Sequence, residues 1–143
     1  MPHSKHGPNH GTFWLEGDIK EVAIENQSFR KTVYTSDQSQ LVVMSLDPNS
    51  ETSKEKQNET DKILFIVKGK AESVLNGRIR EARKHDVVFV PAGTEHHLKN
   101  VGTGNLKLIV IYSPPLYADG TLHITAEDAT AAELKGLERA WEQ

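Results

Sequence analysis

The residues best suited to chemistry lie in the segment HDVVFVPAGTEHHLKN, which runs from His85 to Asn100. Four apolar residues lead into a Pro-Ala-Gly turn at 91–93, and His96 follows shortly after this turn. Two strands joined in this way can aim one imidazole into the mouth of a β-barrel, where it could bind a ligand or transfer a proton. His97 must face the other way if both histidines are in a strand. The simpler alternative is a surface hairpin with an incidental histidine.

A second group of polar residues lies between Asp47 and Lys62, where the sequence contains no apolar side chain. Such a stretch is either a solvated loop or a strand that faces a polar cavity. In a strand, alternate side chains share one face, so Ser53, Glu55 and Gln57 would point together.

The two segments resemble the two motifs of the cupin family. The downstream segment keeps every spacing of the second motif, G-x5-P-x-G-x2-H-x3-N, with His85 in place of the first glycine. The first motif, G-x5-H-x-H-x3–4-E-x6-G, falls with intact spacing on Asn49, Glu55, Gln57, Lys62 and Gly69. Only the final glycine is the family's own residue. This frame favours the strand for the polar segment.

The resemblance covers roughly residues 17–130 and is to the small single-domain cupins, often sugar-phosphate-isomerase-like. It implies a barrel of six or more strands with a pocket, commonly in a dimer, and a divalent ion held by motif residues. His123, in the segment GTLHIT, matches a histidine of these small cupins. Whether it reaches the pocket is open from sequence.

The side chains at the motif positions suit a metal ion poorly. His96 and Glu55 offer lone pairs and Gln57 offers an amide oxygen, but the Lys62 ammonium has three donors and no acceptor. We therefore expect no cofactor. The alternative is a divalent metal (zinc, nickel, manganese or iron) held by Glu55, Gln57 and His96, with His123 as a further candidate.

Lys62 has more than one role open to it. It can neutralise Glu55 or bind an anionic ligand, which is the interpretation adopted here. Burial could instead favour the neutral amine, which can form a Schiff base or act as a base. The side chain could also turn outward. Lys62 and His96 are therefore the candidate catalytic residues.

Short strands must position these residues. Apolar or β-branched runs predict strands at 33–35, 41–46, 63–67, 71–75, 78–80, 87–90 and 106–112. Asn76-Gly77 is a strong hairpin signal. This pattern predicts an all-β, antiparallel, jelly-roll-like barrel.

The last part of the chain changes to a helical period. Thr125 can cap a helix in which Thr130, Leu134, Leu137 and Trp141 form one apolar stripe. We expect this helix at about 125–141, packed on the outside of the barrel or on a partner subunit.

Length and composition limit the alternatives. The chain has 143 residues, a net charge of −3 and no cysteine, which excludes disulfides and thiolate chemistry and gives no basic field for nucleic acid. No segment has the length of a membrane span or the form of a signal peptide, so a cytoplasmic location is expected. We expect a disordered segment at 1–12, with three histidines that could collect a metal, and one domain at 13–143.

The expected function is binding of a small polar or anionic molecule in the central pocket of a homodimeric barrel, through Glu55, Gln57, Lys62 and His96. One alternative is a metal-dependent isomerase or oxygenase. The other is a barrel with a filled interior that binds no ligand.

Overall fold

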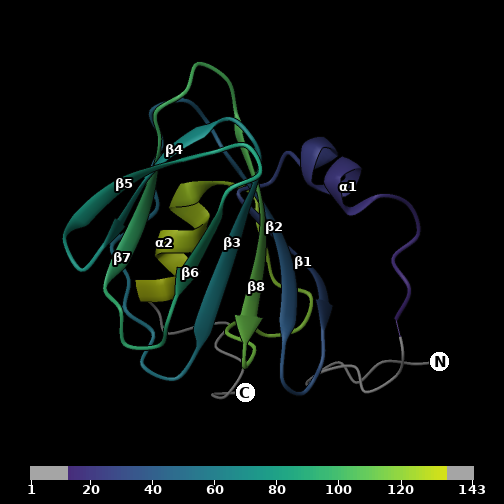
Figure 1. Ribbon diagram of the computed structural model, residues 1–143. Coiled ribbons are helices and arrows are strands. Elements are labelled where there is room, and N and C mark those ends of the chain that lie inside the picture. The colour runs from purple at the N-terminus through teal and green to yellow at the C-terminus, as the bar shows by residue number, and fades with distance from the viewer. Residues whose placement is uncertain (1–12, 135–143) are drawn as a thin grey trace.

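The computed structural model describes residues 13–134, which form two antiparallel sheets and two helices (Figure 1). The order of the larger sheet is β6-β3-β8-β2-β1-β9, and that of the smaller sheet is β5-β4-β7. The strands are β1 (Arg30–Thr35), β2 (Gln40–Leu46), β3 (Asp61–Lys68), β4 (Lys70–Leu75), β5 (Arg78–Arg83), β6 (Val87–Val90), β7 (His96–Asn100), β8 (Leu106–Ser113) and β9 (Leu122–His123). The predicted all-β, antiparallel architecture is confirmed.

The core lies between the two sheets. Its members alternate along the strands and are almost fully buried, among them Met44, Leu46, Ile66, Leu98 and Leu108. Such a core requires side chains of alternate positions to face inward. The edges β5 and β6 belong to different sheets and leave one side of the sandwich open.

Residues at positive φ mark the positions where the cupin motifs have glycine. Asn49 and His85, which replace the first glycine of each motif, have φ of 66° and 77°. Gly69 has φ of 103°, and a Cβ there would approach Leu106 Cα at 3.2 Å. The backbone therefore preserves the motif frame although two of its glycines are replaced.

The polar segment between Asp47 and Lys62 runs as an irregular edge beside β7. Two isolated bridges join Glu51 to Lys99 and Glu55 to His96. The regular alternation that we expected is not observed, because Gln57 is buried but Ser53 is exposed. The segment is thus neither a free loop nor a complete strand.

The helix α1 (Ile19–Glu25) was not predicted from sequence. Asp18 caps it by accepting a hydrogen bond from the Lys20 amide at 2.8 Å. Its fully buried Ala23 packs with Val43 and Val67 on the outer face of the larger sheet. This helix covers part of the apolar outer face of the larger sheet.

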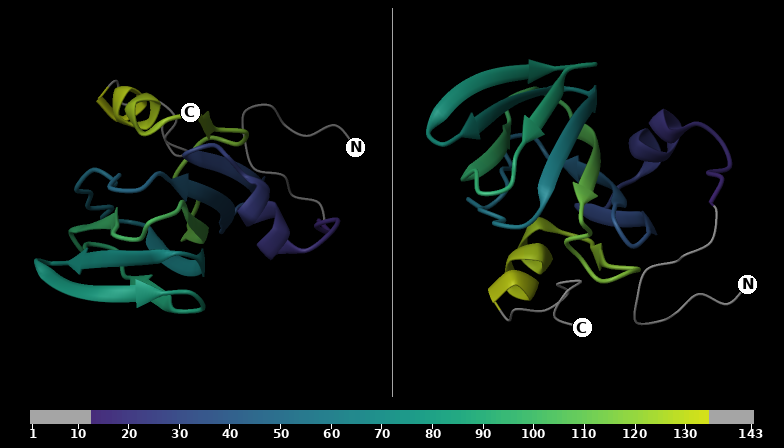
Figure 2. Two further views of the ribbon diagram at one scale, coloured as in Figure 1. Left: turned by 90° about the horizontal axis from the view of Figure 1, so that it is seen from above. Right: turned by 60° about the horizontal axis from the view of Figure 1, so that its bottom comes forward.

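The helix α2 (Ala126–Leu134) starts as predicted, with Thr125 and Asp128 bonded to each other's backbone amides. Ala129 is buried, whereas Thr130, which we expected on the apolar stripe, is exposed. Figure 2 shows α2 against one end of the sandwich, on the side away from the β4–β5 hairpin. The side chain of Leu134 and the predicted positions Leu137 and Trp141 lie outside the described residues.

The expected N-terminal segment 1–12 and its histidines also lie outside the described residues. Within residues 13–134, no helix is long and apolar enough to cross a membrane.

Candidate functional site

Lys62 and His96 meet inside the sandwich, from opposite sheets. The Lys62 Nζ lies 3.2 Å from His96 Nε2, and both side chains are buried. His96 Nδ1 lies 2.9 Å from the Thr94 carbonyl, which can only accept, so Nδ1 carries the hydrogen and Nε2 accepts from Lys62. Burial and then Lys62 lower the pKa of His96. The imidazole is therefore neutral near pH 7.

Glu55 provides the negative charge beside this pair. Burial raises the pKa of Glu55, but the charges of Lys62 and Arg30 outweigh it and hold the pKa below its ordinary value. Gln57 Nε2 donates a hydrogen bond to this carboxylate. The structure thus brings together all four residues that the motif frame selected.

These four residues do not fit a divalent metal ion. The Lys62 ammonium takes the position of the family's glutamate and occupies the lone pair of His96 that a metal would need. Only one imidazole and one carboxylate remain as strong donors. Within residues 13–134, no group of three or more His, Cys, Asp or Glu side chains could hold a metal ion.

Arg30 is a buried charge that the sequence did not indicate. It is 1% exposed, and its Nη1 lies 3.0 Å from His123 Nδ1 on the neighbouring strand. Its guanidinium carbon lies 4.6 Å from the centre of the Tyr117 ring and 5.1 Å from that of Phe29. His123 is therefore buried beside Arg30, a placement that its sequence left open.

Aromatic rings connect Lys62 and Arg30. The Lys62 Nζ lies 5.6 Å from the centre of the Tyr112 ring, and Tyr112 contacts Tyr117 edge to face at 5.5 Å. Among the described residues, the buried side-chain nitrogen and oxygen atoms without a hydrogen-bond partner are Arg30 Nε, Thr60 Oγ1 and the Tyr112 hydroxyl. Unpartnered buried polar atoms of this kind point to water or ligand in the interior.

The interior itself has little free space. A cavity of about 10 Å³ lies beside Lys62 and His96, and one of about 20 Å³ lies between Arg30, Glu55 and α2. Each is about large enough for one water molecule. A ligand of metabolite size therefore does not fit around Lys62 in this conformation.

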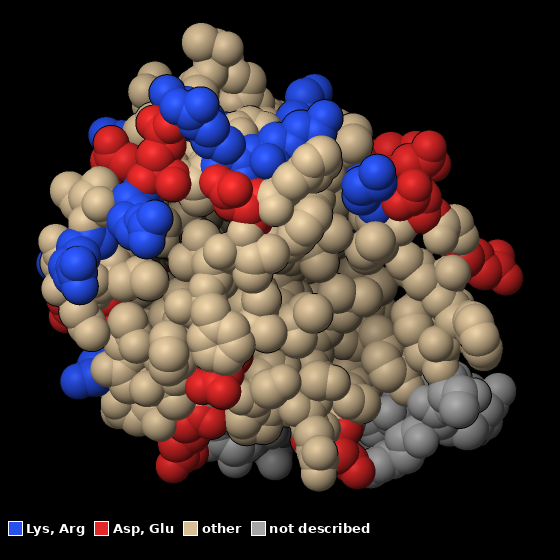
Figure 3. All heavy atoms as spheres, viewed as in Figure 1, with Lys and Arg blue, Asp and Glu red and all other residues tan. Residues whose placement is uncertain are grey.

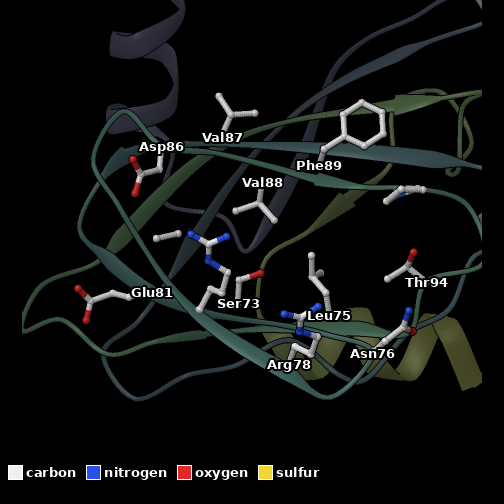
Figure 4. A pocket seen from close by; sticks show the side chains of 13 residues that line it. Ser73, Leu75, Asn76, Arg78, Glu81, Asp86, Val87, Val88, Phe89 and Thr94 are labelled. Atoms are coloured by element: carbon white, nitrogen blue, oxygen red, sulfur yellow. The ribbon is translucent and has the colours of Figure 1, made fainter.

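A ligand-sized cavity of about 660 Å³ opens between the edges β5 and β6 (Figure 4). Its volume is within the range of small-molecule sites. Ser73 and Leu75 line both this cavity and the small one beside Lys62 and His96. Lys62 and His96, two of the residues predicted from sequence, thus lie directly behind its inner wall.

The strand β5 turns two arginines into this cavity. Arg78 pairs with Leu75 and Arg80 with Ser73, so both share the inner face of the sheet, whereas Ile79 is 64% exposed on the outer face. At residues 78–80 this is the reverse of the usual pattern of apolar residues inside and polar residues outside, whereas Ala82, the next inward residue, is buried as usual. Among residues 13–134, neither guanidinium has a hydrogen bond or ion pair.

The sequence contains a signal for the inward direction of Arg78 and Arg80. The Asn76-Gly77 turn has φ of 49° and 80°, which is the two-residue type I′ hairpin. That turn fixes the register, so Arg78 must lie opposite Leu75 and face the same side. The predicted hairpin, read together with its register, would have placed Arg78 and Arg80 inside.

The fold and the motif frame define a cupin whose metal-ligand positions have been replaced, and the chain belongs to the cupin family. The family model for the cupin domain matches residues 42–112.

Several proteins are similar to this chain. YrkC, an uncharacterized protein of Bacillus subtilis, is 34% identical over 123 residues, which cover 81% of this chain and 66% of that protein. An uncharacterized protein of Acanthamoeba polyphaga mimivirus is 33% identical over 113 residues, covering 75% of this chain and 69% of that protein. The chain thus spans about two thirds of the length of these relatives.

Solved structures show the same fold. The crystal structure of BH2720 from Bacillus halodurans has a TM-score of 0.81 and 29% identity, and covers 87% of this chain and 99% of that chain. KdgF from Halomonas has a TM-score of 0.58 and 23% identity, and covers 60% of this chain and 77% of that chain. At 23% identity, the similarity to KdgF shows only a shared fold.

Proposed function

We propose that this cupin binds a small anionic molecule, without a metal ion, in the cavity between β5 and β6. The observation that carries the proposal is the reversed face of β5, which directs Arg78 and Arg80 inward and Ile79 outward. Two guanidinium groups without partners among the described residues can each donate paired hydrogen bonds to a carboxylate or phosphate.

Other lining residues support a polar ligand of metabolite size. Ser73, Asn76 and Thr94 add hydroxyl and amide groups to the wall that carries the arginines. Lys62 and His96 lie behind Ser73 and Leu75, and they are the predicted inner end of the same site. A ligand group that moved Leu75 aside would meet the Lys62 ammonium and the neutral imidazole, which could then act as an acid or base.

Isothermal titration with butyrate, succinate and inorganic phosphate tests the proposal. Arg78→Gln and Arg80→Gln should each weaken binding of the preferred anion about five-fold, as expected for partly exposed ion pairs worth up to ~1 kcal/mol. Lys84→Gln removes the same charge from an exposed residue outside the cavity and should leave binding unchanged. If the double arginine variant bound every anion as tightly as the unmodified protein, the proposal would be wrong.

The predicted homodimer belongs to the same proposal. One row of side chains across the outer face of the larger sheet consists of Phe89, Ile63, Ile111 and Leu41, which are cross-strand neighbours. Phe89 is 52% and Ile111 is 38% exposed. Figure 3 shows few charges over β6, β3 and β8, in contrast to the charged region over β4 and β5. An uncharged apolar face of this kind suits a second copy of the same face.

A further inference from the structure

The cavity between β5 and β6 has opposite charges at its two ends. Figure 4 shows Asp86 and Glu81 at one end and Arg78 with Asn76 and Thr94 at the other. Val88 points into the space between them. The cavity therefore combines a cationic end, an anionic end and an apolar middle.

The carboxylates of Glu81 and Asp86 differ in the number of cations that already pair with them. Glu81 accepts from Arg83 Nε and lies 3.2 Å from Lys70 Nζ, so two cations already neutralise it. Asp86 Oδ2 accepts a hydrogen bond from the Arg83 backbone amide at 2.8 Å. Among the described residues, no cation pairs with Asp86, and its second oxygen has no hydrogen bond. Asp86 is thus the carboxylate that remains open to a ligand.

Apolar residues separate Asp86 from the arginines. Val88 lies on the inner face of β6, opposite Leu64 of β3, and Ala82 follows Arg80 on the inner face of β5. Leu75 lies opposite Arg78, at the cationic end of the cavity. Val87 and Phe89, which also border the cavity, point away from its centre (Figure 4). A short aliphatic chain could lie against Val88 and Ala82 with a charged group at each end.

We propose that the ligand is an amino-carboxylate, a zwitterion whose anionic group lies at Arg78 and Arg80 and whose ammonium lies at Asp86. This inference rests on the proposed function, because it assigns the anionic group to the same arginines. A dianion of the same length would place its second negative charge beside Asp86, where like charges repel. A simple alkylamine would face the two arginines without a counter-charge. The cavity therefore selects a molecule that carries both charges.

The experiment compares four probes of similar length in isothermal titrations: γ-aminobutyrate, butyrate, butylamine and succinate. We expect γ-aminobutyrate to bind about five-fold more tightly than butyrate, since an exposed ammonium–carboxylate pair contributes up to ~1 kcal/mol. Asp86→Asn keeps an oxygen for the Arg83 amide and should abolish this preference, so that γ-aminobutyrate and butyrate bind with similar affinity. Glu59→Gln, at an exposed carboxylate outside the cavity, should leave the preference intact.

The outcomes separate this inference from the proposed function. Butyrate or succinate could bind in an arginine-dependent way while γ-aminobutyrate binds no more tightly than butyrate. In that case the zwitterion proposal would be wrong and the anion site would stand. The zwitterion would also be wrong if the gain persisted in Asp86→Asn. If no probe lost affinity in the double arginine variant, the proposed function would fail. Thermal melting of each variant shows that it is folded when it is titrated.

Discussion

The side-chain amine of Lys62 lies 3.2 Å from Nε2 of His96, and the other ring nitrogen of His96 donates to the Thr94 carbonyl. A cation of the chain itself thus holds the lone pair that a metal would have to occupy. Glu55 supplies the counter-charge and has its own hydrogen bond from Gln57. The motif positions are still assembled at one point of the barrel, but they now form a self-contained polar cluster.

The first prediction concerns the metal. Protein purified without a histidine tag should contain no stoichiometric metal, whereas Lys62→Glu combined with Glu55→His and Gln57→His should bind zinc or nickel. The triple change replaces the ammonium with a carboxylate and adds two imidazoles beside His96, which gives a four-ligand set. Elemental analysis and calorimetry measure the stoichiometry.

A matched control uses His96→Ala in the redesigned protein, which should lose the new site. Stoichiometric metal in the unmodified chain, lost on changing Glu55 or His96, would show that Lys62 does not displace an ion. The metal-dependent isomerase or oxygenase would then become the better interpretation.

The second prediction concerns protonation of His96. Its pKa is lowered by burial and by Lys62, so Lys62→Met should move the pKa upward, toward the ordinary value of 6.5. Titration of the His96 ring signals by NMR measures this shift. Lys54→Met, at an exposed lysine, is the control and should leave the pKa unchanged. No shift, or a downward shift, in Lys62→Met would contradict the contact seen between these side chains.

The same pKa has a consequence for stability. Because the folded-state pKa of His96 is lower than the unfolded value, the unfolded chain binds more protons at mildly acid pH. The contribution of His96 to the free energy of unfolding is therefore complete above about pH 6.5 and is lost as the pH falls through the folded-state pKa. The lowered pKa of Glu55 acts in the same direction at lower pH. Urea unfolding across this range should show a shallower fall for His96→Gln than for the unmodified protein.

The sequence predicted which motif residues meet in the fold, but it did not indicate the other buried residues around them. Spacing placed Lys62, His96, Glu55 and Gln57 together because a jelly roll fixes which strands meet, and the structure brings all four into one cluster. Arg30 was missed because it lies on a strand with no motif, and its burial depends on long-range contacts with His123 and Tyr117. No local pattern encodes such contacts.

Two other features were missed for local reasons. The helix α1 has only seven residues, of which Ala23 alone is buried, so it has too few turns to show an apolar stripe in the sequence. The inward direction of Arg78 and Arg80 required the register of the hairpin in addition to its position. The cavity lies between the edge strands β5 and β6, which do not pair with each other. No periodicity in the sequence indicates how far apart two unpaired edges lie.

The third prediction concerns the glycine positions of the motifs. Gly69→Ala should lower the free energy of unfolding by about 2 kcal/mol or more, because φ is 103° and the new Cβ would meet Leu106 Cα at 3.2 Å. His85→Gly should raise it by about 0.5 kcal/mol, because His85 now holds φ of 77° with a side chain. Urea unfolding measures both. Gly104→Ala, where a Cβ would meet nothing within 4 Å, serves as the control. Equal effects at Gly69 and Gly104 would refute the argument.

The last prediction concerns the outer face of the larger sheet. The helix α1 covers the row that contains Val43 and Ile109, but the adjacent row with Ile63 and Ile111 remains partly exposed. We expect the protein to be a dimer at micromolar concentration and Ile111→Lys to shift it to a monomer, because two buried lysines would face each other across a two-fold interface. Light scattering measures the mass. Ile79→Lys changes a more exposed isoleucine on the other sheet and should leave the dimer intact. A mass near 15.9 kDa for the unmodified chain would rule out the dimer at that concentration.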